Sequence, residues 1–114
     1  MAKGESAMYV LEAMNGPQDG KRWEFEHNIV IGRDAGSAQA SLPVDHAVSR
    51  VHARIDTEPD RLVIADLNSS NGTILGGQPI SCATQLNIGE PFVVGRTMLR
   101  VLREKDSPAN STDV

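Results

Sequence analysis

Apolar residues occur along the chain in short runs, and each run ends at glycine, proline, asparagine or aspartate. None of these runs continues at the spacing of about 3.6 residues that an amphipathic helix requires. The pattern therefore predicts an all-β protein. The runs that fit strands cover residues 9–14, 21–25, 29–32, 51–57, 61–67, 73–75, 84–86, 91–94 and 97–102.

The clearest alternation of apolar and polar residues lies in the predicted strand 51–57. Val51, Ala53 and Ile55 fall on one face, and His52 and Arg54 fall on the other, because successive side chains of a strand point to opposite sides of the sheet. This strand is therefore expected to have one buried face. Many short strands separated by turns are typical of a sandwich or a barrel.

The length and charge of the chain limit its organisation and its partners. A chain of 114 residues, of which 39% are hydrophobic, fits one domain around one core. With a net charge of −4, the chain lacks the overall basic character of proteins that hold nucleic acid, so nucleic acid is not expected as a partner. We expect a domain at residues 8–103, a flexible N-terminus at 1–7, and a disordered tail or linker at 104–114.

The sequence also gives expectations about cellular location, membrane segments and metal binding. Cys82 is the only cysteine, so the chain cannot form an internal disulfide, and a reducing, cytoplasmic location is expected. No apolar stretch has the length of a signal peptide or a membrane span, and no membrane partner is expected. Asp45, His46 and His52 fit no recognised ligand spacing, so we expect neither a metal nor a cofactor.

Five polar side chains lie near predicted strand ends, where loops from one edge of a sandwich can converge. They are Arg33, Ser49, Arg50, Ser70 and Asn71. Guanidinium and hydroxyl groups are the donors that suit the several acceptor oxygens and the negative charge of a phosphate. The sequence therefore predicts an oxyanion site at this edge.

The motifs around these residues resemble those of the forkhead-associated family. They are Gly32-Arg33, then SRVHA at 49–53, then DLNSSNGT at 66–73, and the similarity runs over residues 9–102. The resemblance implies an eleven-stranded β-sandwich of two antiparallel or mixed sheets. It also implies a monomeric module without catalytic activity that binds phosphothreonine in a partner protein, the product of a Ser/Thr kinase, in signalling or assembly.

The resemblance also assigns roles to individual residues. Arg33 and Ser49 would contact the phosphate, Arg50 and Ser70 would support it, and Asn71 would bond the peptide backbone. The residues expected to support the site structurally are Gly32, His52, Asp66, Gly72 and Thr73.

One position differs from the family pattern, and another leaves the preference for neighbouring peptide residues open. Gly76-Gly77 replaces the Asn-Gly pair of many members, and both pairs suit a tight hairpin turn. Ala47, two residues before Ser49, offers no charge to a side chain beyond the phosphothreonine, so the preference there stays open.

The same residues allow other interpretations. Ser49, His52 and Asp66 are the residue types of a hydrolytic triad, but residues 49 and 52 of one strand would point to opposite faces, and no nucleophile elbow surrounds the serine. The segment GRDAGS at 32–37 lacks the Gly-Lys-Ser/Thr ending of a nucleotide-binding loop. Asn71-Gly72 is also a common type I′ turn pair. The alternative function is a sandwich that binds partners without phosphate.

Overall fold

The computed structural model describes residues 8–104, which form eleven strands and no α-helix. The strands are β1 (Tyr9–Ala13), β2 (Arg22–Phe25), β3 (Asn28–Gly32), β4 (Ala40–Ser41), β5 (Ala53–Glu58), β6 (Arg61–Asp66), β7 (Thr73–Leu75), β8 (Gln78–Pro79), β9 (Thr84–Leu86), β10 (Phe92–Val94) and β11 (Thr97–Arg103). The prediction of an eleven-stranded all-β fold is confirmed.

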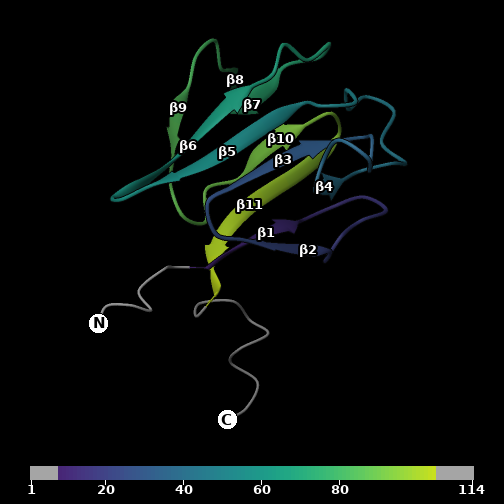
Figure 1. Ribbon diagram of the computed structural model, residues 1–114. Helices are drawn as coiled ribbons and strands as arrows, with labels where there is room; N and C mark the ends of the chain where they lie inside the picture. The colour runs from purple at the N-terminus through teal and green to yellow at the C-terminus, as the bar shows by residue number, and fades with distance from the viewer. Residues whose placement is uncertain (1–7, 105–114) are drawn as a thin grey trace.

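The strands form two sheets that lie face to face as a sandwich (Figure 1). One sheet has the order β2-β1-β11-β10-β7-β8, and its paired strands are antiparallel. The other has the order β4-β3-β5-β6-β9 and is mixed, because β4 runs parallel to β3. The β5–β6 hairpin and the loop between β4 and β5 lie at opposite ends of the molecule (Figure 1).

The hydrophobic core fills the space between the sheets. Leu11 and Leu99 from one sheet and Ile31, Ile55 and Ile64 from the other have no exposed surface. Burial of a side chain of this size stabilises the fold by about 1.5–3 kcal/mol, which makes these alternating positions the main source of stability. Two loop residues, Leu42 and Val48, belong to the same core and anchor the loop between β4 and β5 at both ends.

The strand boundaries differ from the prediction at two kinds of position. The two-residue strands β4 and β8 were not among the predicted runs, and β5 begins at Ala53 rather than at 51. From Ala53 onward the predicted alternation holds, but it is wrong at Val51, which is 39% exposed, and at His52, which is fully buried. The reason is that the imidazole of His52 is held between two loops by hydrogen bonds instead of facing solvent.

The ends of the chain fall mostly outside the described residues. This applies to the predicted N-terminus at 1–7 and to 105–114 of the predicted tail. Glu104, which was assigned to that tail, donates its backbone N–H to the carbonyl oxygen of Met8 at 3.0 Å. Within residues 8–104 there is no helix of the length and hydropathy needed to cross a membrane.

Candidate functional site

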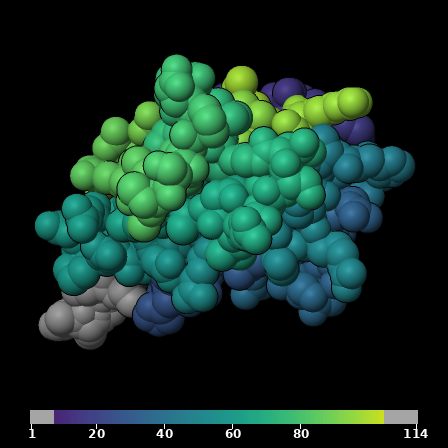
Figure 2. Space-filling model, turned by 90° about the horizontal axis from the view of Figure 1, so that it is seen from above, coloured from purple at the N-terminus to yellow at the C-terminus, as the bar shows by residue number. Residues whose placement is uncertain are grey.

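Three strand ends lie in register at one end of the mixed sheet. Ile31 of β3 pairs with Ala53 of β5, and Ala53 pairs with Asp66 of β6. The segments that follow β3, precede β5 and follow β6 therefore begin side by side. Viewed from above, the segment after β6 packs against the loop before β5 on one face of the molecule (Figure 2).

The end of β3 is in close contact with the loop before β5. A Cβ atom on Gly32 would lie only 2.1 Å from the carbonyl oxygen of Arg50, so a glycine is required there. The backbone N–H of Arg33 donates to the carbonyl oxygen of Ser49 at 2.9 Å, and that of Asp34 donates to Arg50 at 3.2 Å. These contacts fix the distance between the Gly32-Arg33 and Ser49-Arg50 motifs.

Two arginines provide cationic groups at this end of the sheet. Arg33 donates from Nε to the carbonyl oxygen of Val48 at 3.0 Å, which orients its guanidinium group. Within residues 8–104, neither the terminal amino groups of Arg33 nor the guanidinium group of Arg50 has a hydrogen-bond partner, and both side chains are exposed. These donors are therefore available to an anionic ligand.

The carboxylate of Asp34 lies near both arginines. Hydrogen bonds from the Ser37 hydroxyl and the Gly36 N–H lower the pKa of Asp34, and the charges of Arg50 and Arg33 lower it further. The acid is thus ionised at neutral pH and moderates the positive potential of the two guanidinium groups.

The remaining predicted contact residues come from the two facing loops. The backbone N–H of Ser70 donates to the Ser49 hydroxyl oxygen at 2.9 Å, so the hydroxyl hydrogen of Ser49 stays available to a ligand. The side-chain amide of Asn71 donates to the carbonyl oxygen of Ala47 at 2.8 Å. The structure therefore brings Arg33, Ser49, Ser70 and Asn71 into one network, with Arg50 on its border.

His52 connects two of these loops from below. The N–H of Ser49 donates to its Nδ1 at 3.0 Å, so Nε2 carries the hydrogen and donates to the Gly72 carbonyl oxygen at 2.8 Å. The side chain is completely buried. Both ring nitrogens are therefore occupied by backbone groups.

Asp66 organises the loop after β6. Its carboxylate accepts hydrogen bonds from the Ser69 N–H and hydroxyl and from the Thr73 hydroxyl, at 2.6–2.9 Å. Burial alone would raise the pKa of Asp66, but the hydrogen bonds from Ser69 and Thr73 outweigh it and hold the pKa below its usual value. Gly72 has φ +81° and donates its N–H to the Ser69 hydroxyl, which completes the loop.

Asp45 has a structural role in the site that the sequence did not predict, because its residue type suggested only a possible metal ligand. Its carboxylate accepts from the Ala47 N–H at 3.0 Å, the Arg96 N–H at 2.8 Å and the Thr97 hydroxyl at 2.7 Å. It thereby joins the loop before β5 to the turn between β10 and β11. Aspartate side chains often accept a hydrogen bond from the backbone N–H two residues later in a turn, and the bond from Ala47 is of this kind.

The geometry also bears on the other interpretations. Residues 49–52 form an irregular bend rather than a strand, so the expected separation of Ser49 from His52 was wrong. Their contact nevertheless uses the serine backbone, and the second ring nitrogen is 4.0 Å from Asp66 and bonded to Gly72 instead. No charge relay of the hydrolytic type is assembled by these atoms.

The two glycine-containing turns differ from each other. Asn71-Gly72 is not a type I′ turn, because that turn needs a positive φ at both residues and only Gly72 has one. Gly76 and Gly77 have φ +63° and +81° and join β7 to β8, as the tight-turn interpretation predicted.

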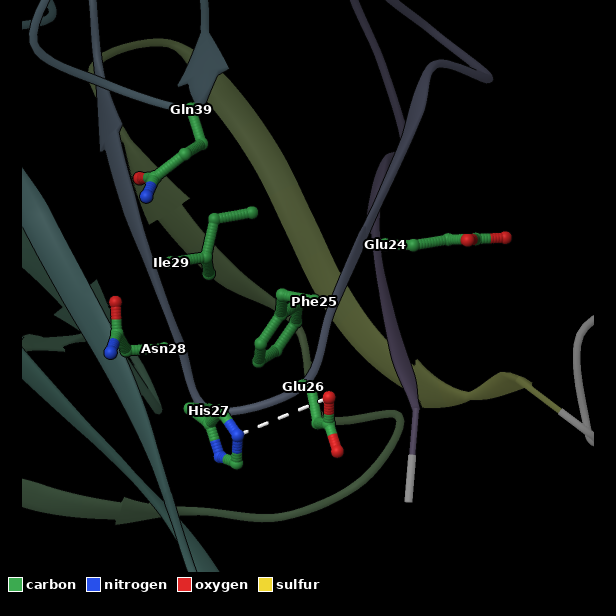
Figure 3. Close-up of a pocket in the computed structure, with 7 residues that line it drawn as sticks. All are labelled: Glu24, Phe25, Glu26, His27, Asn28, Ile29 and Gln39. Atoms are coloured by element: carbon green, nitrogen blue, oxygen red, sulfur yellow. Dashed lines mark ion pairs between the residues drawn. The ribbon is translucent and has the colours of Figure 1, made fainter. Parts of the chain in front are cut away.

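A separate pocket of about 320 Å³ lies at the turn between β2 and β3 (Figure 3). Phe25 and Ile29 contribute apolar surface, and Glu24 and Glu26 contribute carboxylates, with Glu26 paired to His27 at 3.9 Å. Acidic side chains repel a phosphate, so this pocket is a poorer phosphate site than the three motif loops. Among residues 8–104, no three His, Cys, Asp or Glu side chains are grouped as metal ligands would be.

Comparison with known proteins shows which family the chain resembles. The FHA domain family model matches residues 29–95. An FHA domain-containing protein of Arabidopsis thaliana is 30% identical over 74% of this chain, and FhaB of Mycobacterium tuberculosis is 33% identical over 67% of it. The chain spans 22% and 48% of the lengths of these two relatives.

Solved structures agree in fold. The FHA domain of CT664 from Chlamydia trachomatis superposes with a TM-score of 0.77 at 26% identity, covering 83% of this chain and 96% of that one. An FHA domain analysed for phosphothreonine-dependent interactions gives 0.72 at 31% identity, over 83% and 95%. The sheet order, the three motif loops and a family match over more than half of the sequence lead to one conclusion: the chain belongs to the forkhead-associated (FHA) domain family.

Proposed function

We propose that this chain binds phosphothreonine peptides at the end of the mixed sheet where the motif loops converge. The observation that carries the proposal is the meeting of Arg33 and Ser49 at this end, with amino and hydroxyl donors turned to no partner among residues 8–104. A phosphate with nearly two negative charges matches such a set, because charge-assisted hydrogen bonds are about twice as strong as neutral ones.

Each loop residue has a role in the proposed complex. Arg33 and Ser49 donate to the phosphate oxygens, and Arg50 adds positive charge at the border. Ser70 holds the Ser49 hydroxyl oxygen through its backbone N–H. Asn71 donates to the Ala47 carbonyl oxygen in the free protein and would bond the backbone of an extended peptide in the complex.

The relatives support the proposal by what is described for them. One FHA domain of similar structure was analysed for phosphothreonine-dependent interactions, and EmbR of Mycobacterium tuberculosis was solved with a low-affinity phosphopeptide, at 28% identity and a TM-score of 0.74. The EmbR match covers 90% of this chain and 26% of that one. The origin of the phosphate from a Ser/Thr kinase, the monomeric state, the cytoplasmic setting and the absence of catalysis stay predictions.

The test compares one peptide in three forms: phosphothreonine, phosphoserine and unphosphorylated threonine. We expect calorimetric titration to give binding only with the phosphorylated forms, and weaker binding of phosphoserine. One buried methyl group is worth about 0.8 kcal/mol, a few-fold in affinity. Equal affinity for phosphorylated and unphosphorylated threonine would favour the alternative, a sandwich that binds partners without phosphate.

A further inference from the structure

A second pocket lies beside the proposed phosphopeptide site. It has a volume of about 390 Å³ and is formed where the β1–β2 loop, the loop before β5 and the β10–β11 turn meet. Pro17, Val44, His46 and Arg96 are among the residues that line it. None of these positions belongs to the three sequence motifs.

Hydrogen bonds connect this pocket directly to the phosphopeptide site. Asn71 donates to the carbonyl oxygen of Ala47, and the N–H of Ala47 donates to Asp45. The other carboxylate oxygen of Asp45 accepts the N–H of Arg96. Gly95 allows this close contact, because a Cβ there would lie 2.5 Å from Val48 and 3.0 Å from Asp45. Through Ala47 and Asp45 the pocket is therefore adjacent to the proposed phosphopeptide site.

The lining of the pocket combines apolar surface with positive charge. Val44 is 54% exposed and supplies apolar surface, and Pro17 lies in the same lining. Arg96 is exposed, and within residues 8–104 its guanidinium group donates no hydrogen bond. His46 adds a further exposed donor.

Asp45 is the acidic group of the pocket, but it repels an anionic ligand less strongly than an exposed carboxylate would. Only 8% of the surface of Asp45 is exposed, and both of its carboxylate oxygens accept hydrogen bonds. A ligand that enters from solvent therefore meets the guanidinium group first.

We propose that Arg96, assisted by His46, selects phosphopeptides that carry a glutamate close to the phosphothreonine. The methylene groups of the glutamate pack on Val44 and Pro17, and its carboxylate accepts from the guanidinium group. The inference rests on the proposed function, which supplies the anchored peptide. It assigns the choice of a neighbouring residue to the β10–β11 turn, because Ala47 in the loop before β5 has no charge to offer.

The test is a positional scan with phosphothreonine peptides. The parent peptide has alanine at the four positions on either side of the phosphothreonine, and each is replaced in turn by glutamate, leucine or lysine. We expect glutamate at one position on one side to raise the affinity by about 3- to 10-fold, the range of a partly exposed charge-assisted contact. Leucine there should gain less, and lysine should lose affinity.

The variant Arg96→Ala separates the two proposals. It keeps the backbone N–H that Asp45 accepts, so it should fold, bind the all-alanine peptide as before and lose the glutamate gain. Arg61→Ala, at the opposite β5–β6 end, is the matched control and should keep the gain. A glutamate gain that survives Arg96→Ala, a leucine gain larger than the glutamate gain, or no gain at any position overturns the inference. Failure of the all-alanine phosphopeptide itself would refute the proposed function.

Discussion

Arg33 and His52 lie in the same group of loops, but one is exposed and the other has no exposed surface. For Arg33→Ala we expect peptide binding to weaken by about 2–5 kcal/mol, because a charge-assisted bond to the phosphate is lost. The free energy of unfolding should fall by only about 1 kcal/mol, the value of the single bond from Nε to Val48. Peptide titration and denaturant unfolding of the same variant measure both quantities.

The control for this prediction is Arg54→Ala on β5. Arg54 is also exposed, and its guanidinium pairs with Asp56 at 3.0 Å instead of meeting the loops. It should leave binding unchanged. An Arg33→Ala protein that unfolds easily yet still binds phosphopeptide would contradict the assignment of the site.

His52→Ala is predicted to act on stability first. The Ser49 N–H and the Gly72 carbonyl would each lose a buried partner, at about 1–3 kcal/mol per group, and a cavity would add to the loss. Chemical denaturation should therefore show a midpoint well below that of the control His27→Ala, whose side chain is 80% exposed. Unchanged stability with abolished binding would mean that His52 contacts the ligand instead.

Residue-level burial was the least predictable property in the sequence. The alternation 51–55 placed Val51 in the core and gave no indication that His52 is enclosed, because the enclosing Gly72 comes twenty residues later in the chain. Asp45 could not be identified for the same reason, since its partners are Arg96 of the β10–β11 turn and Thr97 of β11, about fifty residues later in the chain. Short-range pattern cannot report contacts that depend on the packing of distant loops.

At the scale of single elements, the end of β3 requires a glycine at position 32. Gly32→Ala would place a Cβ 2.1 Å from the Arg50 carbonyl, so either β3 or the loop before β5 must move. We expect a loss of stability of about 1–3 kcal/mol, the usual cost of overpacking, together with weaker phosphopeptide binding as Arg33 and Ser49 separate. Thermal unfolding and titration measure the two effects.

The matched control is Gly36→Ala, in the loop that follows β3. The nearest atom to a Cβ there is a carboxylate oxygen of Asp34 at 3.7 Å, and its φ is not in the left-handed range. This variant should retain both stability and binding. If both glycine variants behaved alike, the close approach at Gly32 would not be what positions the motifs.

Strands differ in how well they can be predicted. The longer strands β5, β6 and β11 have enough residues to display alternation, and each was predicted within about two residues of its ends. The strands β4 and β8 have two residues each, which is too short for any period to be recognised. Their pairing depends on the neighbours β3 and β7 rather than on their own sequence.

At the scale of the whole molecule, the fold class and the convergence of the motif loops could be predicted, because strand ends in an antiparallel sheet meet at a common edge. The row of Ile31, Ala53 and Asp66 bears this out for the mixed sheet. The sequence could not specify the β10–β11 turn as a neighbour of these loops. That contact joins residues 45 and 96 across the sandwich, and no local signal encodes it.

Three buried or half-buried carboxylates contribute to the dependence of stability on acidic pH. For Glu12, Asp45 and Asp66, burial raises the pKa but hydrogen bonds and nearby charges lower it more, so the pKa of each is below its usual value. A lowered folded-state pKa adds stability above the unfolded value of about 4, and this stability is lost only as the pH falls through the folded-state pKa. The sandwich should therefore stay folded at pH 5.

The phosphate titrates in a higher range than these carboxylates, so binding should be lost before the fold. The second ionisation of a phosphothreonine lies near pH 6, and below it the ligand keeps about one negative charge for Arg33 and Arg50 instead of nearly two. We expect affinity to fall several-fold between pH 7.5 and 5.0, while the unfolding midpoint in denaturant changes little over that range. Peptide titration and unfolding at matched pH and salt measure the two curves. Affinity that stays constant to pH 5, or that declines only together with the fold, would show that the dianionic phosphate is not what the two arginines bind.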